Sequence, residues 1–216
     1  FSLNSQSANQ SQSEINMKKR TKSQLARHGK NLDFFFNSAT NAQIEAGKRW
    51  YSDVNKFCNE LAKEFKTTPL TVAQVISALS PRNKWQRNLI DCKSVFQAIK
   101  DGKEPHEIKV STFHCNKFKA FDIAKNGKRI DASAPKTFNF LHNIAHLDKN
   151  ALTIDVWHIR AIEKKNLAKT PIGTVAYEQI KALTIRKAES IGLTGFEFQA
   201  IIWISAQAFF NNKPTI

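Results

Sequence analysis

The chain has 216 residues, and its 33 Lys and Arg against 18 Asp and Glu give a formal net charge of +15. No apolar run reaches the roughly 18 residues that a membrane span needs, so we expect no membrane association. Three cysteines without a C-x-x-C pair argue against a disulfide scaffold, a zinc ribbon and an iron–sulfur cluster. The first residues lack the basic start and apolar run of a secretory signal, and we therefore expect an intracellular protein of the cytoplasm or nucleoid.

The basic excess extends along the whole chain. Residues 17–30 carry six Lys and Arg and no acid, and residues 31–216 still carry 27 basic against 17 acidic side chains. A folded body with this imbalance repels itself unless a polyanion neutralises it. The charge therefore predicts nucleic acid as the partner, and a basic protein with a solvated face is the alternative.

The N-terminal region differs in composition from the rest. Residues 1–30 are rich in Ser, Asn and Gln and then in basic residues, with little apolar periodicity. This composition predicts a disordered basic arm, followed by one helical domain over residues 31–216. Met17 is the only methionine and precedes three basic residues, which makes it a candidate for the natural start.

From residue 32 onward, apolar residues recur at helical spacing, and no set of alternating strands is present. Gly47 interrupts the first pattern, Thr68 and Pro69 match the cap and first position of a helix, and Asp155 matches another cap. The pattern predicts an all-α protein. The expected helices cover about residues 44–65, 69–79, 89–99, 113–125, 135–145, 156–164, 172–190 and 195–210.

The segment from Ala134 to Ile162 combines two residues of chemical interest. It places Lys136 in the first turn of one helix and Asp155 at the start of the next. A lysine there meets the positive end of the helix dipole, which favours the neutral and nucleophilic amine. Asp155 is equally well explained as a helix N-cap. The two residues alone do not distinguish a catalytic pair from chance in a lysine-rich chain.

The order of elements resembles a known family. A helix, a tight hairpin, a helix with a lysine at its start and then Ile154-Asp155-Val156 are similar to the helix-hairpin-helix superfamily of DNA glycosylases. The separation of 19 residues between Lys136 and Asp155 resembles its 8-oxoguanine DNA glycosylase/AP lyase branch. The resemblance covers about residues 70–210. Three further stretches agree in order: Ala78–Asn83, Asn116–Ile123 and Gln199–Ala206.

The resemblance implies a helix-hairpin-helix DNA glycosylase fold with two helical lobes and the active site between them. The implied partner is double-stranded DNA that contains an oxidised or otherwise modified base, similar to 8-oxoguanine. Lys136 would displace the flipped base and form a Schiff base, and elimination of the 3′ phosphate would then nick the strand. Asp155 would hold or deprotonate the amine and stabilise positive charge on the sugar. No metal or organic cofactor is implied, and we expect a monomer.

The resemblance also implies how the DNA is held. Gln199 is expected to read the hydrogen-bonding edge of the base, Trp203 to stack on its face and Phe140 to line the opposite wall. The residues expected to contact DNA are basic or polar: Arg82, Asn83, Lys84, Arg87, Lys117, Lys119, His158 and Arg160.

The other aromatic and histidine residues have more ordinary interpretations. By burial preference we expect four aromatic residues in the core rather than at bases, namely Trp85, Phe113, Phe118 and Phe121. His142 and His146 are four residues apart, but the glutamate of the H-E-x-x-H motif is absent, so we expect no metal site.

Two departures from the family pattern leave alternatives open. Ala132 and Ala134 occupy hairpin positions where the family usually has glycines, which permit positive φ and a close approach of backbone amides to phosphate. Trp157, with His158 after it, stands where this branch often has His. The alternatives are a glycosylase for a modified pyrimidine or bulky non-damage base, and a non-catalytic DNA-binding protein on the same fold. An RNA-binding protein is a third, although no RNA-binding motif is recognisable.

Overall fold

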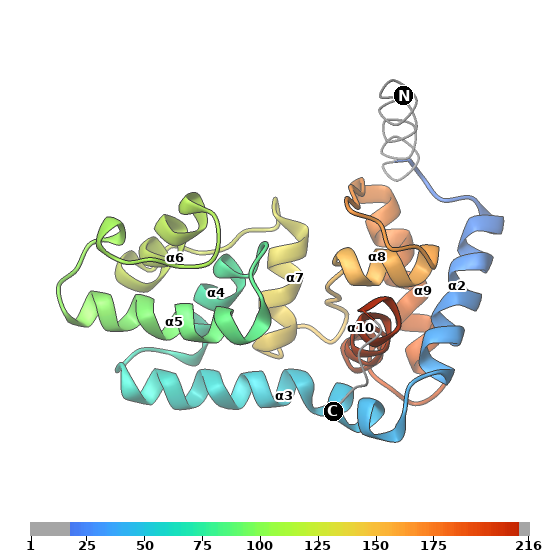
Figure 1. Cartoon of the computed structure of the whole chain (residues 1–216), viewed down its shortest axis with the longest axis horizontal. Coiled ribbons are helices and arrows are strands. Elements are labelled where there is room, and N and C mark those ends of the chain that lie inside the picture. Colours follow the sequence, from blue (N-terminus) through green and yellow to red (C-terminus); the bar gives the residue numbers. More distant parts are fainter. Residues whose placement is uncertain (1–17, 212–216) are drawn as a thin grey trace. The chain divides into compact units, whose positions relative to one another are not determined.

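The computed structural model describes residues 18–211, and these residues form helices joined by loops, with no strand among them (Figure 1). The expectation of an all-α protein is thus confirmed. None of the helices in this range is both long and apolar enough to cross a membrane. The helices are α2 (Lys22–Asn37), α3 (Asn41–Glu64), α4 (Pro69–Leu79), α5 (Trp85–Lys100), η1 (Pro105–Glu107), α6 (His114–Asn126), α7 (Pro135–Ile144), α8 (Val156–Glu163), α9 (Thr174–Glu189) and α10 (Gly195–Asn211).

The chain divides into two compact units. Unit 1 combines the chain up to Trp50 with the chain from Ile154 onward, and unit 2 is Tyr51–Thr153. Helix α3 therefore contributes its first ten residues to unit 1 and the remainder to unit 2.

In unit 1, α10 packs against α2, α8 and α9, and α2 packs against α8 and α9. The side chains that fill the centre come from each of these helices, and Phe35, Ile162, Ile180 and Ile201 are fully buried. Burial of such aliphatic and aromatic side chains is the main source of stability for helices that meet in this way.

The boundary expected for a disordered arm is wrong for residues 20–30. Helix α2 begins at Lys22, where Thr21 caps it and Gln24 completes a capping box. Just before the helix, the Arg20 backbone N–H donates to Oε1 of Gln179 and the Arg20 carbonyl accepts from its Nε2. The polar composition of this segment gave no indication of α2, one face of which is buried. Residues 1–17, including Met17, lie outside the described residues.

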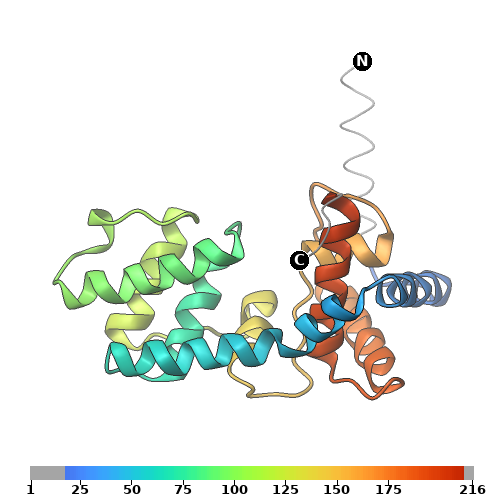
Figure 2. The same cartoon turned by 60° about the horizontal axis from the view of Figure 1, so that its bottom comes forward.

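In unit 2, α4 packs against α5, α6 and α7 (Figures 1 and 2). All residues from Val72 to Leu79 are buried. A helix with so few polar residues is stable only in the interior of a unit, and of its two buried polar side chains Gln74 accepts from the backbone N–H of Ile130.

The helix ends follow local signals in the sequence. The Thr68 side chain accepts from the backbone N–H of Thr71 and Pro69 is the first residue of α4, as expected. Gly127, with φ of 70°, ends α6 in the left-handed conformation. Asp155 caps α8, which confirms the structural interpretation of that residue.

Candidate functional site

Lys136 is the second residue of α7 in unit 2, directly after Pro135. Its side chain is exposed, and within residues 18–211 its ammonium forms no hydrogen bond or ion pair. The N-cap residue Ala134 has no side chain that could satisfy the first turn. The helix therefore begins with an accessible amine and with backbone N–H groups that no cap side chain covers.

Asp155 lies at the start of α8 in unit 1. Its Oδ1 accepts from the backbone N–H of His158 at 2.9 Å, and its side chain is half-buried. The two residues expected to catalyse thus lie at the N-terminal ends of two helices, one in each unit.

In the hairpin between α6 and α7, Ala132 and Ala134 stand where helix-hairpin-helix glycosylases usually have glycines. Neither alanine has a positive φ. Gly127 is the only residue from 127 to 134 with positive φ. Oδ1 of Asp131 instead accepts from the backbone N–H of Ser133 at 2.8 Å, a turn closed by an aspartate side chain. Hydrogen bonds from Ser133 lower the pKa of the Asp131 carboxyl, which is therefore charged at neutral pH. A carboxylate at this turn disfavours the approach of phosphate, so the hairpin differs electrostatically from the expected clamp.

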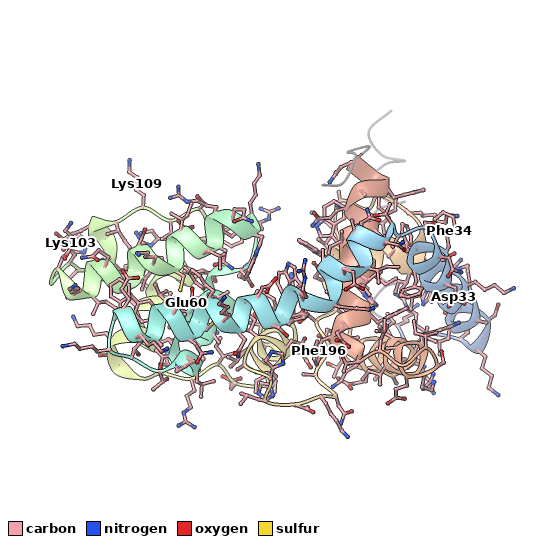
Figure 3. The ribbon with its side chains drawn as sticks, turned by 90° about the horizontal axis from the view of Figure 1, so that it is seen from below. Asp33, Phe34, Glu60, Lys103, Lys109 and Phe196 are labelled. Carbon is pink, nitrogen blue, oxygen red and sulfur yellow. The ribbon has the colours of Figure 1, made fainter. Side chains whose placement is uncertain are left out.

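The basic side chains near this hairpin fall into two groups. Lys125 pairs with Glu104 at 2.8 Å and Lys128 with Asp122 at 3.0 Å, so nearby acids already neutralise both. Arg129 and Lys136, by contrast, are exposed and have no ion pair in the described part of the chain. Earlier in the same unit, Lys109 projects away from the ribbon (Figure 3).

The loop between α4 and α5 is held by one buried carboxylate. Asp91 accepts from Nδ2 of Asn83 at 2.9 Å, from Nε of Arg87 at 2.7 Å and from the backbone N–H of Ser111 at 2.8 Å. Asn83 is therefore engaged inside unit 2, and the expected contact of its amide with DNA is not supported. The Arg87 side chain remains 45% exposed and keeps further donors available.

An exposed aromatic patch lies beside this loop, formed by Phe113, His114 and Phe118 together with Arg82. Phe113 is 50% exposed and Phe118 is 44% exposed, so placing these two in the core was wrong. The Arg82 guanidinium lies 5.5 Å from the centre of the Phe113 ring, and His114 lies 4.9 Å from Phe118. One sequence signal was available, because Phe113 is the N-cap of α6, where a polar residue is usual.

The other two aromatic residues of that group behave differently. Phe121 is buried as expected, whereas Trp85 is half-buried at the start of α5. Lys84, the residue before Trp85, is exposed, and Lys119 is half-buried. Both lysines remain compatible with contact to DNA.

Lys117 and His158 were expected to contact phosphate, but both are buried. Lys117 is 5% exposed, and its Nζ donates to the carbonyl of Ile108 at 2.8 Å. His158 is fully buried, and its Nε2 lies 3.0 Å from Oγ1 of Thr184. Burial lowers the pKa of His158 to about 3, so the ring is neutral at physiological pH. Neither side chain is available to a phosphate.

Arg160 is only partly engaged. Its Nε donates to the carbonyl of Leu167 at 2.9 Å, and its guanidinium lies 4.3 Å from the centre of the Trp157 ring. The side chain is half-buried, and the planar fork retains other N–H groups. Contact with DNA is therefore compatible with its position.

The residues expected to surround the base are divided between the units. Gln199 and Trp203 lie four residues apart on α10 in unit 1, where Gln199 is buried and Trp203 is half-buried. The Trp203 ring lies 5.8 Å from that of Trp50. Phe140 lies in unit 2, with its ring edge-to-face with those of Trp85 and Tyr51 at 6.5 Å and 6.4 Å.

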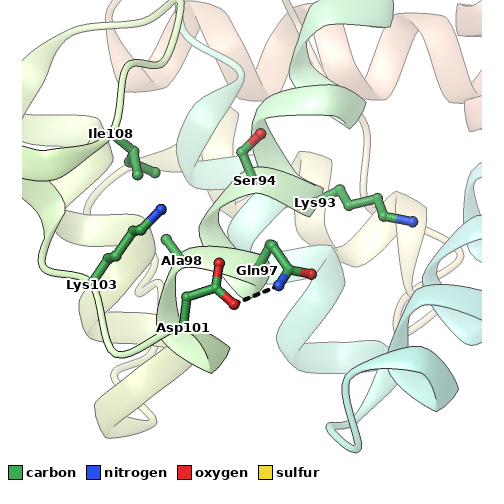
Figure 4. A pocket seen from close by; sticks show the side chains of 7 residues that line it. All are labelled: Lys93, Ser94, Gln97, Ala98, Asp101, Lys103 and Ile108. Atoms are coloured by element: carbon green, nitrogen blue, oxygen red, sulfur yellow. Dashed lines mark hydrogen bonds between the residues drawn. The ribbon is translucent and has the colours of Figure 1, made fainter.

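Unit 2 also has a shallow pocket of about 270 Å³ at the C-terminal end of α5 (Figure 4). Nε2 of Gln97 donates to Asp101 at 2.7 Å across its wall. None of the residues expected to act on DNA lines this pocket, so it is separate from the candidate site. Its lining residues are Lys93, Ser94, Gln97, Ala98, Asp101, Lys103 and Ile108.

Comparison with known proteins gives one match. A model of a family of unknown function, DUF7178, matches residues 14–209. No curated protein and no solved structure matches the chain. The match spans both units.

Proposed function

We propose that this chain, which belongs to the DUF7178 family of unknown function, is a DNA glycosylase with AP lyase activity on a helix-hairpin-helix fold. The observation that carries the proposal is the accessible and unpaired Lys136 in the first turn of α7, directly after the hairpin that follows α6. The resemblance of the surrounding segments to such glycosylases supports the same activity. The proposed substrate is double-stranded DNA with an oxidised or otherwise modified base.

In the proposed reaction Lys136 is the nucleophile. Its neutral Nζ attacks C1′ of the flipped nucleotide, and the bond from C1′ to the base breaks as the base leaves with a proton. The sugar ring opens, and the bond between Nζ and C1′ becomes a Schiff base. Loss of a proton from C2′ then expels the 3′ phosphate and nicks the strand, and water releases the lysine.

Asp155 is the proposed electrostatic partner. A carboxylate beside the sugar stabilises the positive charge that develops as the base leaves, and it can take the proton of the amine. Since Lys136 and Asp155 belong to different units, the reaction requires the DNA complex to bring both to the same sugar.

The charge of both units supports DNA as the partner. Unit 2 carries 17 basic against 10 acidic residues, and the remainder of the chain carries 16 against 8. In unit 2 the aromatic patch adds exposed rings beside Arg82, and such rings stack on unpaired bases while cations contact phosphate. We propose that this patch and Arg82 contact the DNA near the extruded nucleotide.

Borohydride trapping tests the proposed nucleophile. The full chain is incubated with duplexes that each contain one modified base, including 8-oxoguanine and modified pyrimidines, and borohydride is added. A covalent protein–DNA adduct is expected with at least one duplex, and it should disappear in Lys136→Ala and in Lys136→Gln. Lys149→Ala removes another exposed lysine of unit 2 and should trap as well as the wild type. An adduct that persists in Lys136→Ala would show that the assigned nucleophile is wrong.

The role of Asp155 has its own test. Asn caps helices as well as Asp does, so Asp155→Asn keeps the bond to the His158 N–H while removing the charge. We expect it to bind duplex DNA normally and to form the adduct at least tenfold more slowly, which is the effect of about 1.4 kcal/mol on a barrier. An unchanged rate would remove Asp155 from the mechanism.

One observation favours the non-catalytic alternative. The turn at Asp131 has no residue with positive φ, and it carries a carboxylate that the expected phosphate clamp lacks. If the chain binds DNA without catalysing the reaction, it should bind duplex DNA tightly and give no trapped adduct with any duplex of the panel. The same experiment therefore separates the two functions.

A further inference from the structure

Two loops of unit 2 meet at the aromatic patch. The first lies between α4 and α5 and carries Arg82, and the second precedes α6 and leads to Phe113. Oγ1 of Thr112, in the second loop, donates to the carbonyl of Pro81 in the first at 2.7 Å. The same oxygen accepts from Nδ2 of Asn116 at 2.9 Å, which joins this contact to α6. Hydrogen bonds therefore hold together the two segments that form the patch.

The buried Asp91 carboxylate links the same two loops a second time. Its Oδ2 accepts from Nδ2 of Asn83 in the first loop and from the backbone N–H of Ser111 in the second. Arg82, next to Asn83, has a φ of 58°, a left-handed conformation that is uncommon for a residue other than glycine. Such a conformation persists only where surrounding contacts impose it, and it is concentrated at binding and active sites. The loop therefore presents Arg82 in a fixed backbone position.

The rings of the patch are exposed and held in place. Phe113 and Phe118 are the two exposed phenylalanines in the described part of unit 2. The Arg82 guanidinium lies against the ring of Phe113, and the His114 ring lies against that of Phe118. Because these contacts already order the side chains, a ligand that stacks on the rings loses little affinity to the ordering of side chains.

The excess positive charge of unit 2 lies in the same part of the chain. Residues 80–130 carry 12 basic and 5 acidic side chains, whereas the rest of unit 2 carries five of each. Lys84 and Lys109 are close to the two loops in sequence, and both are exposed and form no ion pair with any described residue. A ligand that complements both the rings and the charge needs flat apolar faces and many negative charges. An unpaired nucleic acid strand has both.

We propose that the aromatic patch binds single-stranded DNA, with unpaired and unmodified bases stacked on Phe113 and Phe118 and with Arg82 at the backbone phosphates. In a duplex neighbouring bases cover one another, so the rings can act only where the strand is unpaired. The choice of DNA over RNA rests on the proposed function. The binding itself goes beyond that function, because it needs neither a modified base nor a reaction.

The test compares two strands that carry the same phosphates and the same fluorescent label. One consists of ten thymidines, and the other consists of ten abasic tetrahydrofuran nucleotides. Binding of each strand to the full chain is measured by fluorescence anisotropy at several salt concentrations. We expect the thymidine strand to bind about tenfold more tightly, or about 1.4 kcal/mol, through stacking of its bases. The salt dependence of the two affinities should be the same, since the strands offer the same phosphates.

Substitutions at one ring isolate the stacking. Phe118→Ala should remove most of the preference for the thymidine strand and leave the affinities for the abasic strand and for an unmodified duplex unchanged. Phe118→Trp keeps a flat aromatic face and should keep the preference. Leu147→Ala is the matched control, because it removes another exposed apolar side chain of unit 2, and it should bind both strands as the wild type does.

Three results would contradict the inference. Equal binding of the two strands by the wild type, or a preference that survives in both Phe113→Ala and Phe118→Ala, would overturn it and would favour a protein as the partner of the patch. Tighter binding of a uridine RNA strand of the same length would overturn the choice of DNA.

The outcome is separable from that of the proposed reaction. A thymidine preference that depends on the rings, together with no borohydride adduct on any duplex, would leave the single-strand surface standing and remove the catalytic role of Lys136. An adduct through Lys136 without that preference would do the reverse.

Discussion

Gly47 of α3 lies so close to Ile201 of α10 that no side chain fits between the two helices. A β-carbon at Gly47 would come within 2.4 Å of Cγ1 of Ile201 and within 2.8 Å of its Cα and backbone nitrogen. Helix α3 continues through this position without a break, although the sequence analysis predicted that the glycine interrupts the helical pattern. The glycine thus serves a close approach of two helices rather than a turn.

We expect Gly47→Ala to destabilise the protein. Alanine is the better helix former by about 1 kcal/mol, but overpacking against backbone atoms costs about 1–3 kcal/mol and the contact distance places this site at the upper end. The measurement is urea denaturation followed by circular dichroism. Gly29→Ala is the matched control, because its β-carbon would meet the flexible end of Lys187 at 3.3 Å. Equal stability of the two variants would contradict the explanation.

Local features of the fold were predictable because their causes are local. Thr68 and Asp155 cap helices through bonds to residues three positions ahead, and Pro69 can stand at a first position because it needs no N–H partner. Helical periodicity likewise identified the helices of unit 2, including the almost completely buried α4.

The errors have a common physical origin in contacts between distant residues. Arg20 was placed in a disordered arm, whereas its backbone pairs with Gln179, which lies 159 positions away. Lys117 and His158 have the residue types of phosphate contacts, but neighbours from other helices bury both. Phe113 and Phe118 have the residue type of a core and lie at the surface. Residue type alone does not encode burial.

The stability of the protein should fall on acidification because of His158. Burial lowers its pKa to about 3 in the folded state, against 6.5 for an unperturbed histidine. Between these pH values the unfolded chain binds a proton that the folded chain does not, so stability is complete above pH 6.5 and is lost as the pH falls towards 3. The expected loss from this residue between pH 7 and pH 4.5 is about 2–3 kcal/mol.

Denaturation at a series of pH values checks the assignment to His158. His158→Asn does not titrate, so its free energy of unfolding should change less with pH across this window, even if the variant is less stable at pH 7. His106→Asn, at an exposed histidine of unit 2, should retain the wild-type slope. If the slope of His158→Asn also matches the wild type, the buried ring is not the cause.

Only one of the three cysteines should react in the folded protein. Burial raises the pKa of Cys58 to about 12 and raises that of Cys92 well above its usual value, while Cys115 is exposed. The thiolate is the reactive form, so a disulfide reagent such as Ellman's should modify one thiol rapidly and all three after denaturation. Cys115→Ser should abolish the rapid phase. Rapid reaction of two thiols in the native chain would show that one of the buried cysteines is accessible.

The two kinds of basic residue in unit 2 should respond differently to substitution. Each phosphate contact contributes about −0.9 to the slope of log K against log salt concentration. Arg129→Ala removes an exposed cation and should reduce the magnitude of the slope for duplex DNA by about one, with little effect on stability. Lys117→Met removes an ammonium that donates to the Ile108 carbonyl inside the unit. It should leave the slope unchanged and lower the free energy of unfolding by about 1–3 kcal/mol, since the carbonyl loses its charged donor. A reduced slope in Lys117→Met would instead mean that DNA binding releases this lysine from the interior.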